Sequence, residues 1–267
     1  MKRLLSLLYH DVYAVDPTES GFAGAGADRY KLPLPEFDLQ LAGLAFVLDA
    51  PPVVITQPQA EGTEVPVAIT VDDGGLSYHS EVADRLEMRG WRGHCFMTSD
   101  WIGRPGFLDK HHLRELHARG HVIGSHSASH PARFAACKPS EMLREWRESR
   151  AELQDVLGAP VTTASVPGGY FSARVAETAA EAGLTTLFTS EPETRVRRIG
   201  GCTVLGRYAI RRGDDSGYAA ELAARKPSAV YAAWLKWNGK KVLKAMLGAG
   251  YPQLAGRLAG LAGNHEP

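Results

Sequence analysis

The sequence predicts an α/β fold in which a mainly parallel sheet is covered by helices, and three observations lead to this prediction. Its 267 residues are enough for one large domain or two small ones. Short apolar runs alternate with longer stretches of helical period, which is the pattern of consecutive strand and helix units. Polar clusters directly follow five of the apolar runs, as they do where the carboxyl ends of strands build a site.

Seven strands and five helices follow from this alternation. The apolar runs have the length of strands, and the stretches between them have apolar residues at helical spacing. Four of the helices are followed by Gly90, Gly120, Gly158 or Gly183, and glycine ends helices because it adopts a left-handed backbone. The predicted strands are residues 4–12, 67–71, 93–97, 122–124, 162–166, 185–188 and 203–210, and the predicted helices are residues 35–48, 79–89, 110–118, 140–157 and 173–182.

Composition and charge exclude several classes of protein. Lys plus Arg and Asp plus Glu both number 30, so the chain lacks the basic balance of a nucleic-acid-binding protein. No apolar run is long enough for a transmembrane helix, and we interpret residues 1–8 as a strand and not as a signal peptide. Three dispersed cysteines without a Cys-x-x-Cys pair indicate a reducing compartment, so we expect a cytoplasmic protein.

The last part of the chain differs in composition from the rest. We predict a catalytic domain at residues 1–225 and a helical tail at residues 226–267, where six basic residues and one acidic residue give a net charge of +5. Lysines at helical spacing beside apolar residues could place the tail on an anionic membrane as a peripheral contact. Alternatively, the apolar side covers the barrel or pairs two protomers, which Gly239 and Gly248 favour because they weaken a free-standing helix. The stripe comprises Lys236, Lys240 and Lys244 beside Tyr231, Leu235, Val242 and Met246, with Trp234 and Trp237 nearby.

The five polar clusters are predicted to meet in one cleft. In α/β barrels the carboxyl ends of the strands build the active site, and each cluster lies at or near the carboxyl end of a predicted strand. The clusters are residues 9–11, 72–75, 125–130, 167–170 and 190–191.

Two of these clusters contain residues that could bind a metal ion. Asp72 and Asp73 are adjacent carboxylates whose mutual repulsion a cation would relieve, although Asp-Gly alone is equally typical of a polar turn. His126 and His130 are four residues apart, so one helical turn would place both imidazoles on the same side. Two imidazoles and one carboxylate form a ligand set with open coordination positions, which suits zinc, cobalt, nickel or iron in hydrolytic enzymes.

These residues carry a resemblance to a known family. The segment Thr70-Val71-Asp72-Asp73-Gly74 resembles the Thr-Phe-Asp-Asp-Gly motif of the polysaccharide deacetylases, the NodB-homology carbohydrate esterases of family 4. His126-Ser127-x-x-His130 resembles their second motif. Further segments follow in the expected order, so the similarity extends from about residue 4 to about residue 210. These segments are Trp101-Ile102-Gly103, Phe107-Leu108 and Pro167-Gly168-Gly169.

The resemblance implies a fold, a cofactor and roles for individual residues. It implies a distorted (β/α)7 barrel, a divalent metal on Asp73, His126 and His130 with zinc as the expected ion, and Asp72 as the general base. A backbone N–H near Gly168 would bind the oxyanion, because a missing side chain permits close approach. Gly169 and Tyr170 follow in the same segment, and the ring of Trp101 is either a surface that stacks on a sugar or a lid or core residue.

The sequence departs from the family pattern at two places. The family has an arginine two residues before the proline of its third motif, where it steadies the base, and this chain has Ser165. The family also has a histidine as general acid near the last strand, whereas the only histidine after His130 is His265. We predict that His10 supplies the acid, because the first and last strands of a barrel are neighbours. Alternatively, His10 only packs or binds substrate.

The predicted function is metal-dependent removal of N-acetyl groups from an amino sugar in a polysaccharide, oligosaccharide or glycolipid precursor. One alternative keeps the metal and the amide hydrolysis but acts on a small non-sugar amide. Another is a catalytically impaired glycan-binding relative, which the missing arginine and histidine favour. The intact set of metal ligands and base argues against this last alternative, because a binding protein has no need for two carboxylates in one site.

Overall fold

The computed structural model describes residues 1–56, 65–169 and 171–247, with side chains through Gly239. Strands and helices alternate as predicted, and within these residues no helix is both long and apolar enough to cross a membrane. The strands are β1 (Leu5–Tyr9), β2 (Val12–Tyr13), β3 (Leu32–Pro33), β4 (Val67–Val71), β5 (His94–Met97), β6 (Val122–Ser125), β7 (Thr163–Ser165), β8 (Thr186–Phe188), β9 (Arg197–Ile199), β10 (Cys202–Leu205) and β11 (Tyr208–Ala209). The helices are α1 (Ala25–Asp28), α2 (Leu34–Val47), α3 (Ala83–Glu87), α4 (Lys110–Ala118), α5 (Pro139–Leu157), α6 (Ala173–Glu181), α7 (Tyr218–Ala223) and α8 (Pro227–Leu247).

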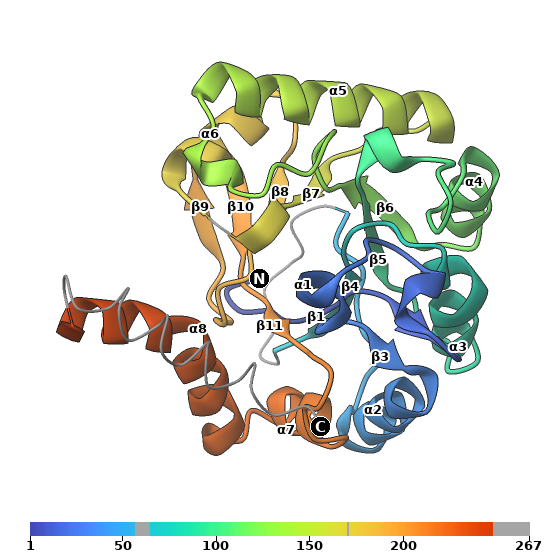
Figure 1. Ribbon diagram of the computed structural model, residues 1–267, viewed down its shortest axis with the longest axis vertical. Helices are drawn as coiled ribbons and strands as arrows, with labels where there is room; N and C mark the ends of the chain where they lie inside the picture. Colours follow the sequence, from blue (N-terminus) through green and yellow to red (C-terminus); the bar gives the residue numbers. More distant parts are fainter. Residues whose placement is uncertain (57–64, 170, 248–267) are drawn as a thin grey trace, which may run out of the picture.

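The main sheet is a curled half-barrel with helices on its outer side (Figure 1). In the described part of the chain it has nine strands in the order β11-β1-β4-β5-β6-β7-β8-β10-β9. All neighbours are parallel except β9 and β10. The predicted distorted barrel of (β/α) units is therefore confirmed, and so is the predicted neighbourhood of the first and last strands, since β11 pairs with β1.

The predicted strand at residues 203–210 is wrong in one respect, because it is two strands and not one. β10 pairs with β8, whereas β11 pairs with β1 on the other side of the barrel opening. The chain crosses between them at Gly206 and Arg207. A side chain on Gly206 would come within 2.5 Å of the Glu191 carbonyl oxygen, so only glycine fits here. The Arg207 N–H donates to that same carbonyl at 2.9 Å, which fixes the crossing.

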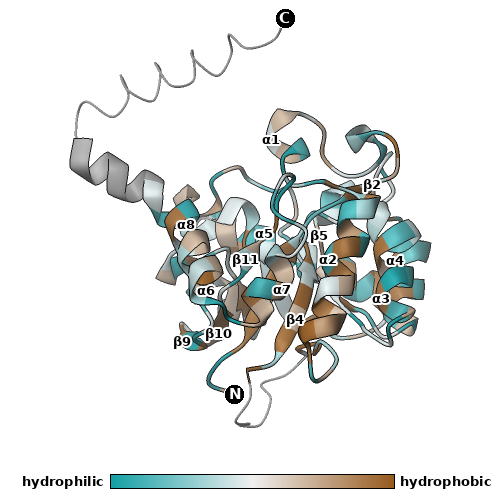
Figure 2. Cartoon of the chain, turned by 90° about the horizontal axis from the view of Figure 1, so that it is seen from below, coloured by the Kyte–Doolittle hydropathy of each residue, from teal (hydrophilic) through white to brown (hydrophobic). Residues whose placement is uncertain are grey.

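The strands are buried on both faces, as expected for a sheet covered by helices. Cys95 and Met97 on β5 belong to the core under the helices, whereas Phe96 between them belongs to the core inside the barrel, together with Phe188 and Leu205. Figure 2 shows hydrophobic residues along the central strand β4 and hydrophilic residues on the peripheral helix α4. This two-sided burial gives the strand ends a rigid support.

Helix ends agree with the glycine signals. Gly158 ends α5 with a left-handed backbone (φ 63°), and Gly90, Gly120 and Gly183 also have positive φ after their helices. The predicted helix at residues 79–89 is less regular than expected, because it begins as a π-helical turn, Tyr78–Val82, before α3.

Helix α8 packs on the barrel through small residues. Ala229 and Ala233 are buried, and Lys236 forms an ion pair with Asp214 at 2.6 Å. Tyr231, Trp234 and Leu235 are exposed at 63, 44 and 49%. Tyr231 and Trp234 of the predicted stripe therefore face away from the barrel, whereas Trp237 lines a cavity of the barrel. Lys240, Val242, Lys244 and Met246 of the stripe lie beyond the described side chains, and residues 248–267 of the predicted tail lie outside the described residues.

Candidate active site

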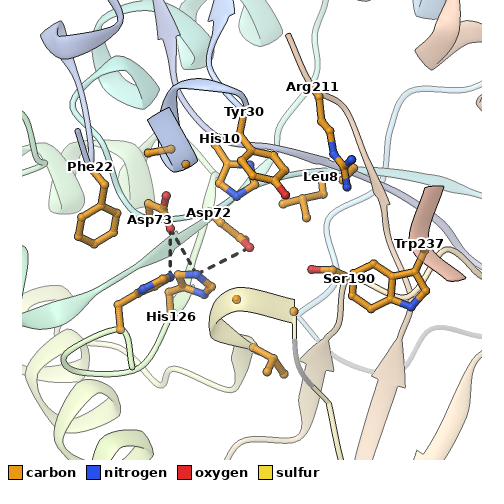
Figure 3. A pocket seen from close by; sticks show the side chains of 17 residues that line it. Leu8, His10, Phe22, Tyr30, Asp72, Asp73, His126, Ser190, Arg211 and Trp237 are labelled. Carbon is orange, nitrogen blue, oxygen red and sulfur yellow. Dashed lines mark ion pairs between the residues drawn. The ribbon is translucent and has the colours of Figure 1, made fainter. Parts of the chain in front are cut away.

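A cavity of about 280 Å³ opens at the carboxyl ends of the strands (Figure 3). Each of the five polar clusters contributes to its wall, so the predicted convergence on one cleft is confirmed. The wall also contains Trp237 of α8, which lies beyond the predicted domain boundary at residue 225. The lining residues are Leu8, His10, Phe22, Gly26, Ala27, Tyr30, Asp72, Asp73, His126, His130, Val166, Gly168, Gly169, Ser190, Ala209, Arg211 and Trp237.

Asp73, His126 and His130 offer three ligand atoms that all lie within 4.8 Å of one another. His126 Nε2 is 3.4 Å from Asp73 Oδ1, and His130 Nε2 is 3.6 Å from the same oxygen. His126 Nδ1 donates to the Ser165 carbonyl oxygen at 3.1 Å, which leaves the Nε2 lone pair directed at the cluster. Among the described residues, this is the group whose geometry fits a metal ion.

The two histidines reach this geometry through a loop and not through a helical turn. After β6 the chain takes a left-handed backbone at Ser127 (φ 62°) and again at His130 (φ 60°). The Ser127 hydroxyl accepts from the His130 N–H at 3.1 Å. Glu145, buried on α5, accepts from both the backbone N–H and the hydroxyl of Ser129 at 2.8 and 2.9 Å. The sequence expectation of a helical turn is therefore wrong, although both imidazoles do face the same side.

Asp73 also has a left-handed backbone (φ 76°). A non-glycine residue in this conformation is strained, and such strain is concentrated at functional sites. Burial would raise the pKa of the Asp73 carboxyl, but its hydrogen bond to His126 and the nearby charges of His10, His126 and His130 outweigh burial and hold the pKa below its ordinary value. Asp73 is therefore an anion before any cation arrives.

Asp72 is held by an arginine that the sequence analysis did not identify. Arg207 Nη1 donates to Asp72 Oδ1 at 2.6 Å, and Nη2 donates to Oδ2 at 2.8 Å. Ser165 donates its hydroxyl to Oδ2 at 2.9 Å. Burial opposes ionisation of Asp72, but the charges of Arg207 and His126 outweigh it and hold the pKa of the carboxyl below its ordinary value.

Arg207 contacts Ser165, the position at which the resemblance implies an arginine. Its guanidinium lies against the Ser165 hydroxyl at 2.7 Å, and its Nε donates to the Thr189 carbonyl oxygen at 2.9 Å. The side chain is fully buried. A signal was present in the sequence, because an arginine inside the predicted strand at 203–210 must have a buried partner if that strand lies in the core.

His10 lies in the wall of the cavity with its ring 4.7 Å from the Tyr30 ring. Its Nδ1 is buried and has no hydrogen-bond partner among the described residues. The adjacent Asp11 faces elsewhere, where it accepts from the hydroxyls of Ser20 and Ser77 at 2.5 and 2.8 Å. Asp11 therefore does not orient the His10 ring.

The glycines of the third motif lie in the cavity wall, whereas Trp101 does not. Gly168 and Gly169 both have left-handed backbones, with φ of 63° and 70°. A side chain on Gly169 would come within 2.9 Å of Ser190 and 3.1 Å of Trp237. Trp101 is not among the lining residues of the cavity, and its ring packs edge-to-face against Phe22, which is one of them, at 4.8 Å between ring centroids. Tyr170 lies outside the described residues.

Comparison with known proteins identifies the fold and its family. The family model described as polysaccharide deacetylase matches residues 59–187. The chain carries a polysaccharide deacetylase domain. This domain is similar to the Bacillus subtilis protein YxkH, which is named as a polysaccharide deacetylase, with 24% identity over 60% of this chain and 54% of that protein. The chain spans about half or less of the length of the curated relatives it matches.

Solved structures support the fold of the deacetylase domain. It is similar to the Streptococcus pyogenes deacetylase PplD in complex with acetate, with a TM-score of 0.66 and 16% identity over 80% of this chain and 95% of that chain. It is also similar to IcaB from Ammonifex degensii, with a TM-score of 0.66 and 22% identity over 84% and 97% of the two chains.

Proposed function

We propose that this protein is a metal-dependent hydrolase that removes N-acetyl groups from an amino sugar of a glycan or glycolipid precursor. One observation carries the proposal: an anionic Asp and two imidazoles converge within 4.8 Å, beside a second carboxylate that an arginine keeps ionised. The deacetylase family and the acetate in the PplD structure point to acetyl transfer to water.

The residues fit a divalent metal, with zinc as the proposed ion. Asp73, His126 and His130 would hold it, because two imidazole nitrogens and a carboxylate oxygen are a ligand set of catalytic zinc sites. When bound, such a cation supplies Lewis acidity, which lowers the pKa of water toward about 7 and polarises an amide carbonyl. Cobalt, nickel and iron are compatible with the same ligands.

Asp72 would act as the general base. It is adjacent to the ligand Asp73, and its Oδ2 lies 3.8 Å from His126 Nε2, so it faces the place where water would be bound. Arg207 and Ser165 hold its two oxygens and fix their direction. The general base of a hydrolase must be within hydrogen-bond reach of the water and must be ionised, and Asp72 meets the second requirement through Arg207.

His10 and the third-motif glycines would complete the reaction. His10 would protonate the departing amine, because its buried and unpartnered Nδ1 belongs to a ring in the cavity wall. The backbone near Gly168 would bind the oxyanion, since a glycine there lets the substrate approach the main chain. We further propose a reducing compartment, which the free thiols of Cys95, Cys137 and Cys202 support.

Acetate release tests the proposal. The purified chain is stripped of metal, reloaded with zinc, cobalt or nickel, and assayed on N-acetylated oligosaccharides, N-acetylated glycolipids and small non-sugar acetamides. Metal-dependent acetate release from the sugars is the expected result. Release from the non-sugar amides alone would favour an amidohydrolase. Glycan binding without any release, in a protein that holds metal, would favour the impaired glycan-binding relative.

A further inference from the structure

The cavity has two chemically different ends. The proposed metal ligands lie at one end, and a cationic side chain lies at the other. Figure 3 shows Arg211 across the cavity from His126 and Phe22, with its guanidinium near Leu8, Tyr30 and Trp237. A smaller cavity adjoins this end and shares Ser190, Ala209, Arg211 and Trp237 with the main one. The carboxylates of Asp72 and Asp73 therefore mark one end of the site, and a cation marks the other.

The cations around this end differ in how they are neutralised. Arg207 is paired with Asp72, and Lys236 is paired with Asp214 at 2.6 Å. Within residues 1–56, 65–169 and 171–247, no carboxylate pairs with the Arg211 guanidinium, and its Nε is buried without a hydrogen-bond partner. A buried donor that lacks a partner is costly, so a ligand oxygen at this position would remove an existing penalty.

Arg211 is also held in place. Its backbone N–H donates to Asp214 Oδ2 at 3.0 Å, and its guanidinium lies over the Tyr30 ring, 5.3 Å from the centroid. Tyr30 in turn packs on His10, with its ring tilted against the imidazole. A fixed guanidinium presents paired donors that match carboxylate or phosphate oxygens, and little order is lost when an anion binds.

We propose that Arg211 is a specificity residue that binds an anionic substituent, a phosphate ester or a carboxylate, carried by the acylated sugar. This inference rests on the proposed function, since it places the acyl group at the Asp72 end of the cavity. Tyr30 and Trp237 would line the space between the two ends, where aromatic rings can pack on a sugar. A neutral N-acetylated sugar would leave the Arg211 guanidinium without a partner, whereas the anionic substituent of a charged sugar would pair with it.

Kinetics of matched substrates test the inference in the metal-loaded protein. The substrates are an N-acetylglucosamine oligomer, N-acetylglucosamine 1-phosphate and N-acetylmuramic acid, of which the last two distinguish phosphate from carboxylate. Arg211→Gln should raise KM for the preferred anionic sugar about tenfold or more and should change KM for the neutral substrate far less, because hydrogen bonds to charged groups are worth about a factor of ten or more. Arg211→Lys should give an intermediate KM. Arg212→Gln, an exposed neighbour that packs on Tyr13, is the charge-matched control and should change nothing.

Binding to the metal-free protein separates this inference from the proposed function. Calorimetry with N-acetylglucosamine 1-phosphate, N-acetylmuramic acid and N-acetylglucosamine at fixed ionic strength needs no turnover. Tighter binding of an anionic sugar that Arg211→Gln abolishes and Arg212→Gln retains supports the inference, even if no acetate is ever released. Equal affinity for charged and neutral sugars, or equal losses in both variants, would overturn it and would leave the deacetylase proposal intact.

Discussion

Arg207 and Asp72 form a buried two-point ion pair, with both terminal nitrogens of the guanidinium on the two carboxylate oxygens at 2.6 and 2.8 Å. The arginine comes from the crossing between β10 and β11, whereas Asp72 follows β4 on the far side of β1. The pair therefore joins the two sides of the barrel opening. We infer that it replaces the arginine that the resemblance implies at the position of Ser165.

Exchanging the two residues tests this replacement. Arg207→Met should lower the free energy of unfolding by about 3 to 5 kcal/mol, because it leaves a buried carboxylate without its partner. It should also move the acidic limb of the pH profile of kcat/KM to higher pH, since burial then dominates and raises the pKa of Asp72. The double variant Ser165→Arg, Arg207→Ser keeps the composition and returns the arginine to the family position. It should therefore recover part of the free energy of unfolding and move the acidic limb part of the way back to lower pH.

Urea unfolding and a pH profile measure these effects. Ser165→Arg alone is the control and should be destabilising, because it adds a second buried cation beside Arg207. If the double variant is no better than Arg207→Met, Arg207 does not act as the displaced family arginine.

Gly169 is predicted to be essential for the shape of the cavity. Gly169→Ala would place a methyl group within 2.9 Å of Ser190 and 3.1 Å of Trp237, and should reduce kcat/KM at least about tenfold. Gly158→Ala is the matched control, because its backbone is equally left-handed but nothing lies within 4 Å. Both variants should lose about 1 to 2 kcal/mol of stability from the strained backbone. An activity loss of the same size in Gly158→Ala would show that strain, and not the cavity wall, is responsible.

His10 is predicted to donate the proton to the leaving amine. His10→Ala should keep the metal content, lower kcat by on the order of 10² and remove the alkaline limb of the pH profile. Metal analysis and a pH-rate profile on an amide substrate check this. A near-normal kcat would assign His10 to packing on Tyr30 and would require another acid.

The sequence predicted the alternation of strands and helices and the five converging clusters well, because apolar runs and residue spacing are local properties. It did not predict what depends on distant contacts. The break at Gly206 follows from the Glu191 carbonyl, and the loop that carries His130 depends on Glu145 of α5. The sequence could not decide between a sugar contact and a lid or core role for Trp101, because the position of Trp101 outside the cavity lining, against Phe22, depends on contacts remote in sequence. The only sequence signal for Arg207 was a charged residue within an apolar predicted strand.

His94 is predicted to make stability depend on pH. It is buried, its Nδ1 donates to the Ile69 carbonyl oxygen, and its Nε2 accepts from the Ile55 N–H, so the neutral ring fits and burial lowers its pKa to about 4. The unfolded chain binds the proton near pH 6.5, so this histidine costs stability progressively as the pH falls from about 6.5 to 4. The loss approaches about 3 kcal/mol at the lower end.

Urea unfolding between pH 7 and pH 4.5 measures this dependence. His94→Gln should flatten it, whereas His111→Gln, whose side chain is 83% exposed, should leave it unchanged. The same pH dependence in His94→Gln and in the parent would assign the effect to other groups.

Metal content measured beside acetate release tests the central claim most directly. Asp73→Ala, His126→Ala and His130→Ala should each lose the metal and the activity, because these three residues are the proposed ligands. Asp72→Asn should retain the metal and lose the activity, because Asp72 is the proposed base and its amide oxygen can take the Oδ2 position, where it still accepts from Ser165 and from Arg207 Nη2. If Asp72→Asn loses the metal as completely as His126→Ala, Asp72 is a ligand and the proposed division of roles between the two adjacent carboxylates is wrong.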